Sequence, residues 1–231
     1  MIRVYVLCLW LLAAETGSAQ RIKYQGLKAD TGTVYLRHNP LGWMDFLDGN
    51  VTVGGEYRFN RTWSATLDAG AIWYSTYLPK TRQATGLLLR PGARLYPGKY
   101  KDYFIDLQLH YKQVMYHVKD WIERDVVQDV ASYEELARFR FKKRVMGVHI
   151  MGGLKQYFTN NRRFFMEIYL GLGVHFKKEG LYNEPPDSRF EHGFRMLAQN
   201  DRVSENNTTN VPGKRVLPAV PGGLRIIYRL R

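Results

Sequence analysis

Residues 164–176, FFMEIYLGLGVHF, alternate between two kinds of side chain. Every second position, from the first phenylalanine to the last, is apolar, while the intervening positions include Glu167, Tyr169, two glycines and His175. Successive side chains of a β-strand point to opposite faces, so a period of two is the signature of a strand. The segment therefore predicts a strand with one wholly apolar face and one polar face.

The same alternation recurs along most of the chain, and we expect eight strands. The segments between them alternate in length: those at 60–61, 97–102 and 159–163 are short, whereas 117–140 and 177–215 are long. The remaining connections, 39–48 and 76–85, are also longer than the short turns. The expected strands cover 31–38, 49–59, 62–75, 86–96, 103–116, 145–158, 164–176 and 223–231.

The first 19 residues have the three parts of a secretory signal. Arg3 is followed by the apolar run 4–14, and small residues at 17–19 precede an expected cleavage site before Gln20. Eleven apolar residues are too few to cross a bilayer as a helix. We therefore expect a cleaved signal peptide over 1–19 and a single domain over 20–231. The only cysteine, Cys8, would leave with the signal, so no disulfide or thiolate metal site is expected in the mature chain.

The charge balance is strongly basic, with 34 Lys and Arg against 21 Asp and Glu, for a formal net charge of +13. A basic chain suits nucleic acid, anionic lipid or acidic glycans as partners. Because the export signal separates this chain from nucleic acid, we expect its anionic partner to be outer-membrane lipid, above all the phosphates of lipopolysaccharide. The mean hydropathy is −0.37, and no apolar run after residue 19 is long enough for a transmembrane helix.

Together these features predict an all-β protein of the bacterial outer membrane: an eight-stranded antiparallel up-and-down transmembrane β-barrel with short periplasmic turns and long extracellular loops. Each expected strand is close to the length that crosses a bilayer when tilted. Aromatic residues at strand ends suit the girdles at the two membrane interfaces. They are Tyr57, Phe59, Trp63, Trp73, Tyr103, Tyr111, Phe158, Phe164, Phe176 and Tyr228.

The chain resembles the small outer-membrane barrels of the OmpA/OmpX type, and more narrowly the "outer membrane protein beta-barrel domain" family. The segments that carry the resemblance are GNVTVGGEYRFNRTWSATLDAGAIWY, GGLKQYFTNNRRFFMEIYLGLGVHF and the closing LRIIYRLR. The resemblance is architectural and includes no catalytic motif. It implies a non-enzymatic protein that serves envelope structure, surface interaction or limited solute passage, alone or with other envelope proteins. The chain departs from such barrels at its end, which is Leu230-Arg231 rather than an aromatic residue.

Eight strands enclose a space just wide enough to be filled by side chains. The inward positions carry both charge signs, and buried charges have to pair because an unpaired one is costly. We expect a plug of ion pairs; the alternative is a narrow pore or pocket whose excess of arginine favours anions. The predicted lumen network is Glu56, Arg58, Asp68, Arg90, Arg94, Asp106, Lys112, Glu167, Arg225 and Arg229.

Catalytic and metal sites are not predicted. His110, His149 and His175 face inward, but a serine-type lipid deacylase needs a serine beside a histidine, and none shares their strand faces. No two histidines have the spacing of metal ligands along the chain, so we expect neither metal nor cofactor. Two alternatives stay open: an enzyme that deacylates or acylates lipid A, and a soluble periplasmic lipocalin-like carrier, whose polar and apolar faces would be reversed.

The segment 117–140 is expected to contain a short amphipathic helix, because Ile122, Val126 and Val130 recur at helical spacing. A basic stripe follows it within RFRFKKR. We expect the stripe to lie at the outer rim and bind lipopolysaccharide phosphates. The alternative is that it pairs with the acidic residues just before it. The rim residues are Arg138, Arg140, Lys142 and Arg144.

Overall fold

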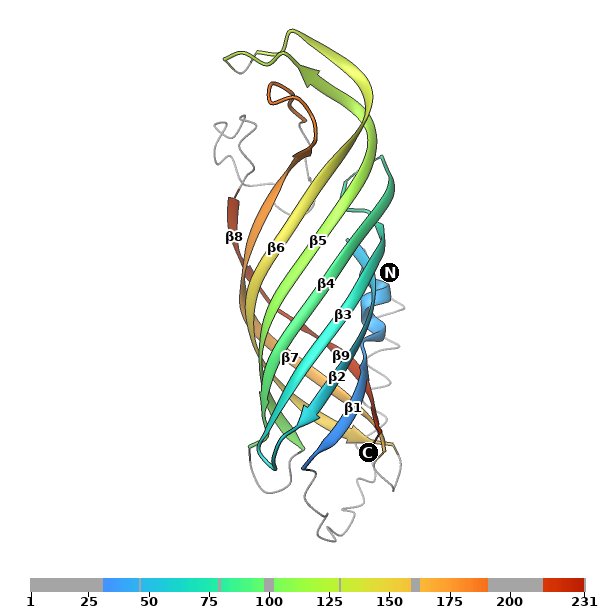
Figure 1. The fold of residues 1–231 in the computed structure, drawn as a ribbon, viewed down its shortest axis with the longest axis vertical. Helices are drawn as coiled ribbons and strands as arrows, with labels where there is room; N and C mark the ends of the chain where they lie inside the picture. Colours follow the sequence, from blue (N-terminus) through green and yellow to red (C-terminus); the bar gives the residue numbers. More distant parts are fainter. Residues whose placement is uncertain are drawn as a thin grey trace, which may run out of the picture. The chain divides into compact units, whose positions relative to one another are not determined.

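The computed structural model describes residues 31–45, 47–78, 80–97, 102–128, 130–158, 163–190 and 214–230. The expected signal segment 1–19 and residues 191–213 of the long loop lie outside these ranges. The described residues form nine strands and one short 3₁₀-helix (Figure 1). The elements are β1 (Thr33–His38), η1 (Pro40–Met44), β2 (Asp48–Arg58), β3 (Trp63–Ser75), β4 (Thr81–Leu95), β5 (Tyr103–Arg124), β6 (Tyr133–Tyr157), β7 (Phe164–Tyr182), β8 (Lys214–Ala219) and β9 (Gly222–Arg229).

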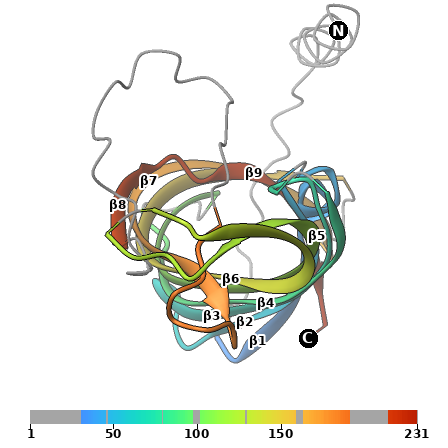
Figure 2. The same ribbon diagram turned by 90° about the horizontal axis from the view of Figure 1, so that it is seen from above.

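Eight of these strands close into a ring (Figure 2). Strands β1 to β7 pair with their sequence neighbours, all antiparallel, and β9 pairs with both β7 and β1. Strand β8 lies farther along β7, where it pairs with Gly173–Lys178, whereas β9 pairs with Phe164–Leu170. The predicted all-β antiparallel arrangement is therefore confirmed. Among the described residues, no helix has the length and apolar character that crossing a membrane requires.

The predicted helix within 117–140 is wrong, because β5 and β6 continue through this region as one long hairpin. The two strands stay paired from Tyr103 opposite Leu154 as far as Arg124 opposite Tyr133. The apolar residues that recur at helical spacing belong to the two arms and the turn of this hairpin. On β5 the inward apolar side chains fall instead at even-numbered positions, which is the period of a strand. They are Phe104, Val114, Tyr116, Val118 and Ile122.

Other strand ends also differ from expectation. Strand β4 begins at Thr81 and β7 ends at Tyr182, so both are longer than the sequence pattern indicated. These strands extend on the side of the ring where the long β5–β6 hairpin projects (Figure 1). Beyond β7, Arg189 forms a β-bridge with Glu123 of β5, and Phe190 packs against Phe139 of β6 with ring centroids 4.6 Å apart.

The two faces of the ring differ sharply in polarity. Large apolar side chains on the outward face are exposed, with Ile150 at 60% and Leu172 at 71%, whereas Arg94 and Asp106 on the inward face are 0% exposed. This is the reverse of the distribution in a typical soluble domain, where charged residues are rarely buried. Further exposed apolar residues of the ring are Val53, Leu67, Leu87, Leu107, Leu109, Val148, Leu170 and Val174.

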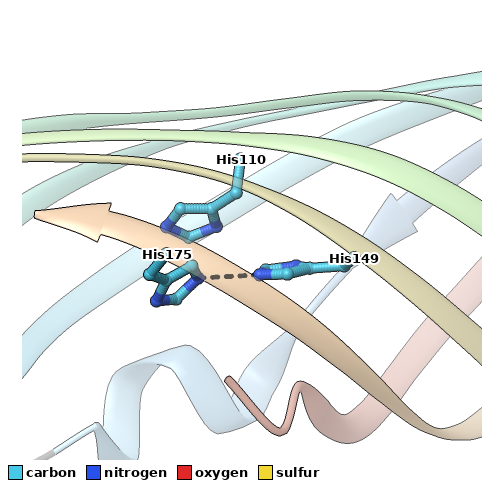
Figure 3. Close-up of side chains that lie close together, drawn as sticks. All are labelled: His110, His149 and His175. Atoms are coloured by element: carbon cyan, nitrogen blue, oxygen red, sulfur yellow. Dashed lines mark hydrogen bonds between the residues drawn. The ribbon is translucent and has the colours of Figure 1, made fainter. Parts of the chain in front are cut away.

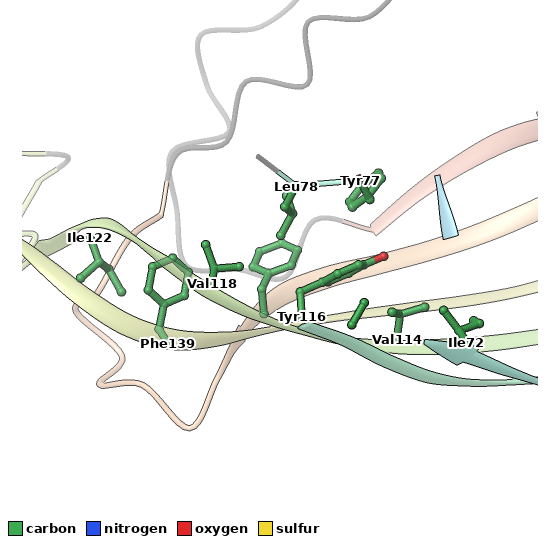
Figure 4. Close-up of a cluster of buried hydrophobic side chains, with 10 residues drawn as sticks. Ile72, Tyr77, Leu78, Val114, Tyr116, Val118, Ile122 and Phe139 are labelled. Atoms are coloured by element: carbon green, nitrogen blue, oxygen red, sulfur yellow. The ribbon is translucent and has the colours of Figure 1, made fainter. Parts of the chain in front are cut away.

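The interior contains three apolar clusters, and charged side chains contact the two that lie nearer the short turns. The larger cluster lies where the β5–β6 hairpin projects (Figure 4). It comprises Ile72, Tyr77, Leu78, Ala84, Val114, Tyr116, Val118, Ile122, Phe139 and Phe141. Two smaller clusters lie nearer the short turns: Tyr96, Phe104, Met151 and Tyr169, and then Tyr35, Phe165 and Ile227. The interior is thus filled over most of its length.

Candidate functional site: the polar interior

Arg94, from β4, is the centre of a buried ion network. Its Nη1 donates to Glu56 Oε2 at 3.0 Å and to Glu167 Oε1 at 2.6 Å, and its Nη2 donates to Asp106 Oδ2 at 2.8 Å. Its guanidinium carbon also lies 3.9 Å from the ring centroid of Phe104. One arginine therefore bonds to carboxylates from three strands, β2, β5 and β7, and so links opposite parts of the ring wall.

Two further arginines complete the network. Arg37 Nη2 lies 3.5 Å from Asp68 Oδ2 and 3.8 Å from Asp106 Oδ2. Arg225 Nη1 lies 3.2 Å from Asp106 Oδ2 and 3.9 Å from Glu167 Oε2. All these groups are almost wholly buried, and removing one partner of such a group is costly because it leaves an uncompensated buried charge.

The ion pairs around Arg94, Arg37 and Arg225 join six of the ten predicted network residues, and the other four make the contacts given next. Arg58 stacks on the ring of Tyr96 at 3.9 Å, and Arg229 lies half-buried near the end of β9. Arg90 contacts His110, and Lys112 pairs with Asp48. The six that meet are Glu56, Asp68, Arg94, Asp106, Glu167 and Arg225.

Several interior charges were missed by the sequence analysis. One is Arg37 in β1, whose alternation is short and weak. Another is Lys155 of β6, whose Nζ donates to Tyr96 Oη at 3.0 Å. Asp48 and Lys143 lie where the predicted strands had not begun. In the structure Asp48 is the first residue of β2 and Lys143 lies within β6, and Lys143 Nζ lies 2.6 Å from Asp48 Oδ2.

Asp48 gathers a second polar group beneath the larger apolar cluster. Its Oδ1 accepts hydrogen bonds from Tyr116 Oη and Ser75 Oγ, both at 2.8 Å. Tyr77, in the loop after β3, donates to Glu179 Oε1 at 2.5 Å. Burial, together with the Glu179 hydrogen bond, raises the pKa of Tyr77 above its usual value, so its phenol stays protonated at neutral pH.

Three histidines converge in the interior from neighbouring strands (Figure 3). His110 comes from β5, His149 from β6 and His175 from β7, and their ring centroids are 4.8 to 5.0 Å apart. His149 Nε2 lies 2.7 Å from His175 Nε2. Arg90 Nε donates to His110 Nδ1 at 3.3 Å. One nitrogen of each ring lies within 4.8 Å of the other two.

The strand register explains why these rings meet. His110 and His175 both lie opposite Gly147 of β6, and His149 lies opposite Gly173 of β7. A Cβ on Gly147 would lie 2.5 Å from His175 Cδ2, and a Cβ on Gly173 would lie 2.4 Å from His149 Cδ2. The glycines therefore leave the space that the imidazoles occupy. The sequence did hold a signal, since Gly-Val-His occurs at both 147–149 and 173–175, but spacing along one strand does not reveal a contact between strands.

The predicted rim residues form a stripe on the outward face of β6. Arg138, Arg140 and Arg144 are exposed and Lys142 is half-buried, while the alternate residues Phe139 and Phe141 point inward. Arg140 and Lys142 lie 5.0 and 5.2 Å from the ring centroid of Tyr182.

The acidic residues of the hairpin have other partners than the stripe. Arg124 pairs with Glu135 at 3.3 Å and Arg189 pairs with Glu123 at 2.5 Å. Within the described ranges, no ion pair joins the stripe to the acidic residues that precede it. Among the described residues, the stripe contacts uncharged side chains: Tyr182, and Gln113, whose Oε1 accepts from Arg144 Nη2 at 3.4 Å.

Comparisons with protein-family models, curated proteins and solved structures found no match for this chain.

Proposed function

We propose that this protein is an outer-membrane β-barrel of the OmpA/OmpX-like class, with a plugged lumen, that serves envelope structure and surface interaction. The observation that carries the proposal is the reversed polarity of the ring, with exposed apolar side chains outside and paired charges inside. Lipid solvates such an outer face, whereas water does not. A soluble lipocalin-like carrier would have the opposite polarity.

The height of the apolar outer face supports the same proposal. On β3, the exposed Trp63 and Trp73 are ten residues apart. At about 3.4 Å per residue and a tilt of about 40°, this interval covers about 25 Å, the height of the apolar band of outer-membrane barrels. Other exposed aromatic residues lie near the short-turn end of the ring and suit one interfacial girdle: Tyr57, Phe59, Tyr103, Phe158, Phe164 and Tyr228.

The filled interior favours a structural barrel over an open pore. The Arg94 network contacts Phe104 and Tyr96 of a smaller apolar cluster, and ions would have to displace paired buried charges in order to pass. In this barrel, we propose that the short turns face the periplasm and that the β5–β6 hairpin projects outside the cell as a surface element.

The three histidines have one another and Arg90 as polar partners, without a serine, so we propose no lipid-modifying chemistry.

The test is membrane fractionation followed by electrophoresis with and without boiling, and then recording in planar bilayers. The proposal expects the protein in the outer-membrane fraction, faster migration of the unboiled form, and no steady single-channel conductance. Recovery in the soluble periplasmic fraction with equal mobility would overturn the membrane assignment. Steady conductance from a correctly folded sample would instead overturn the plug.

Lipopolysaccharide is the partner that we propose for the stripe of Arg138, Arg140, Lys142 and Arg144. The stripe continues the outward face of β6 directly beyond Met146 and Val148 of the apolar band, at the depth where lipid phosphates would lie. Arginine binds phosphate through paired hydrogen bonds as well as charge.

A variant with all four stripe residues changed to Gln is expected to bind lipopolysaccharide vesicles more weakly and with less dependence on salt. The matched control changes the three arginines to lysine, which keeps the charge and is expected to keep most of the affinity. Equal affinity of the wild type and the Gln variant would contradict this role.

A further inference from the structure

We propose that His110, His149 and His175 form a binding site for one divalent transition-metal ion, for which Zn²⁺ is the natural probe. Zn–N bonds are about 2.0–2.1 Å, so two nitrogens on one tetrahedral ion lie about 3.3 Å apart. The nitrogens of His149 and His175 are 2.7 Å apart, and one nitrogen of each ring lies within 4.8 Å of the others. Binding one ion then requires ring rotations that bring all three separations, now between 2.7 Å and 4.8 Å, close to the separation on a tetrahedral ion.

The site is built on rigid elements. Each histidine comes from a different strand of a continuously paired sheet, with Gly147 between His110 and His175 and Gly173 beside His149. Ligands held by paired strands are positioned more precisely than ligands on loops. The proposal therefore depends on the ring fold, and it holds whether or not the ring enters a membrane.

The donor set determines the class of ion. Neutral imidazoles suit zinc, copper and nickel, whereas calcium and magnesium require oxygen ligands. The group consists of three histidines with no carboxylate among its ligands. Three protein ligands also leave one position of a tetrahedral ion for water or a small anion.

Arg90 provides a way to distinguish a metal site from a cluster of histidines that only fills the interior. Its guanidinium, 3.3 Å from His110, repels a cation in the cluster and holds the Nδ1 lone pair of that ring. Removing Arg90 should therefore strengthen metal binding, because it removes the repulsion and frees His110 to place its proton on Nδ1. If the cluster were only a hydrogen-bonded filling of the interior, changing Arg90 would have no effect on affinity for zinc.

The experiment uses the full chain purified in detergent without a histidine tag and treated with a chelator. Zn²⁺ is titrated in competition with a chromophoric chelator, and Co²⁺ absorption reports the coordination geometry. We expect one ion per chain and a tetrahedral Co²⁺ spectrum. Replacing one ligand, as in His149→Gln or His175→Gln, should weaken binding by about tenfold or more, since even outer-shell partners contribute about 10–100-fold.

The matched control is His117→Gln, which changes an exposed histidine of β5 and should leave the affinity for zinc unchanged. Arg90→Met should bind zinc more tightly than the wild type, and it tests the site without changing any ligand. Gel mobility without boiling verifies that each variant is folded. Absence of zinc binding in the wild type, or equal affinity in the wild type and the folded histidine variants, would overturn the proposal. The zinc titration is done in detergent and does not require insertion into a membrane. A failure of the proposed membrane location would therefore appear in the fractionation experiment, not in this titration.

Discussion

At the scale of single residues, the interior depends most on Arg94. This one side chain bonds to Glu56, Asp106 and Glu167, which come from three different strands and are each at most 2% exposed. Because the Arg94 side chain is fully buried, water could not solvate these carboxylates if the guanidinium were removed. The arginine thus compensates several carboxylates that would otherwise repel one another within the ring.

We predict that Arg94→Met lowers the free energy of unfolding by about 3–5 kcal/mol, because it leaves buried carboxylates without their main partner. Urea unfolding in detergent, followed by tryptophan fluorescence, measures this change. The control Arg61→Met removes an exposed arginine and should stay within about 0.5 kcal/mol of the wild type. Equal stability of the two variants would contradict the role assigned to Arg94.

A second prediction concerns the glycines beside the histidines. Gly173→Ala should destabilise the fold by about 1–3 kcal/mol, because the new Cβ would meet His149 Cδ2 at 2.4 Å and the Val148 carbonyl oxygen at 2.5 Å. Gly152→Ala is the matched control, since a Cβ there has nothing within 4 Å. The same unfolding measurement compares the two variants, and a larger loss at Gly152 would be inconsistent with this packing.

Single residues were predictable where they depend on one strand alone. The alternation placed Glu56, Arg94 and Glu167 on the inward face, and the structure places them there. Partners were harder to predict, because they depend on register between strands. Arg90 contacts His110, and Lys112 contacts Asp48, rather than the Arg94 network. The three histidines meet only because Gly147 and Gly173 lie opposite them.

At the scale of elements, the most prominent feature is the β5–β6 hairpin, whose two strands are the longest of the described strands. Its strands continue to Arg124 and from Tyr133, and its inner face carries apolar side chains that pack with Tyr77 and Leu78. A hairpin alone is marginally stable in water, so this packing holds the projecting part in place. Phe190 adds a cap on Phe139 and Phe141.

We predict that Phe139→Ala increases amide hydrogen exchange along the projecting hairpin, because it leaves a cavity in the cluster that orders it. Leu136→Ala, at an exposed position of the same strand, should leave exchange near the wild-type rate. Hydrogen exchange with mass spectrometry measures this on peptides from the projecting parts of β5 and β6. Unchanged protection in Phe139→Ala would mean that the hairpin does not depend on the cluster.

The eight strands of the ring and their order were predictable, whereas β8 (Lys214–Ala219) and the strand ends were not. A period of two identifies a half-buried strand from its own residues. The period is lost where charged residues occur on both faces of a strand. In the hairpin, Lys119 and Asp120 interrupt the series in this way. There the long-range pairing of β5 with β6, rather than the local pattern, decides the conformation.

At the scale of the whole molecule, the ring has a charged interior and an apolar exterior. Inside the ring, the buried charges are flanked by apolar clusters, and on the outside large apolar side chains are exposed. These two features together are the basis of the proposed location in the outer membrane. They also explain why the low mean hydropathy of the chain does not reveal an apolar face.

The most direct test is spin-label accessibility in reconstituted vesicles. The only native cysteine is Cys8, so single cysteines in a chain that begins at Gln20 give labels without background. A label at Ile150, on the outward face of the ring, should collide with oxygen far more than with a water-soluble nickel chelate. A label at Trp121, on the projecting hairpin, should show the reverse. Preferential collision with the nickel chelate at both positions would contradict the account, because the apolar face would then lie in water.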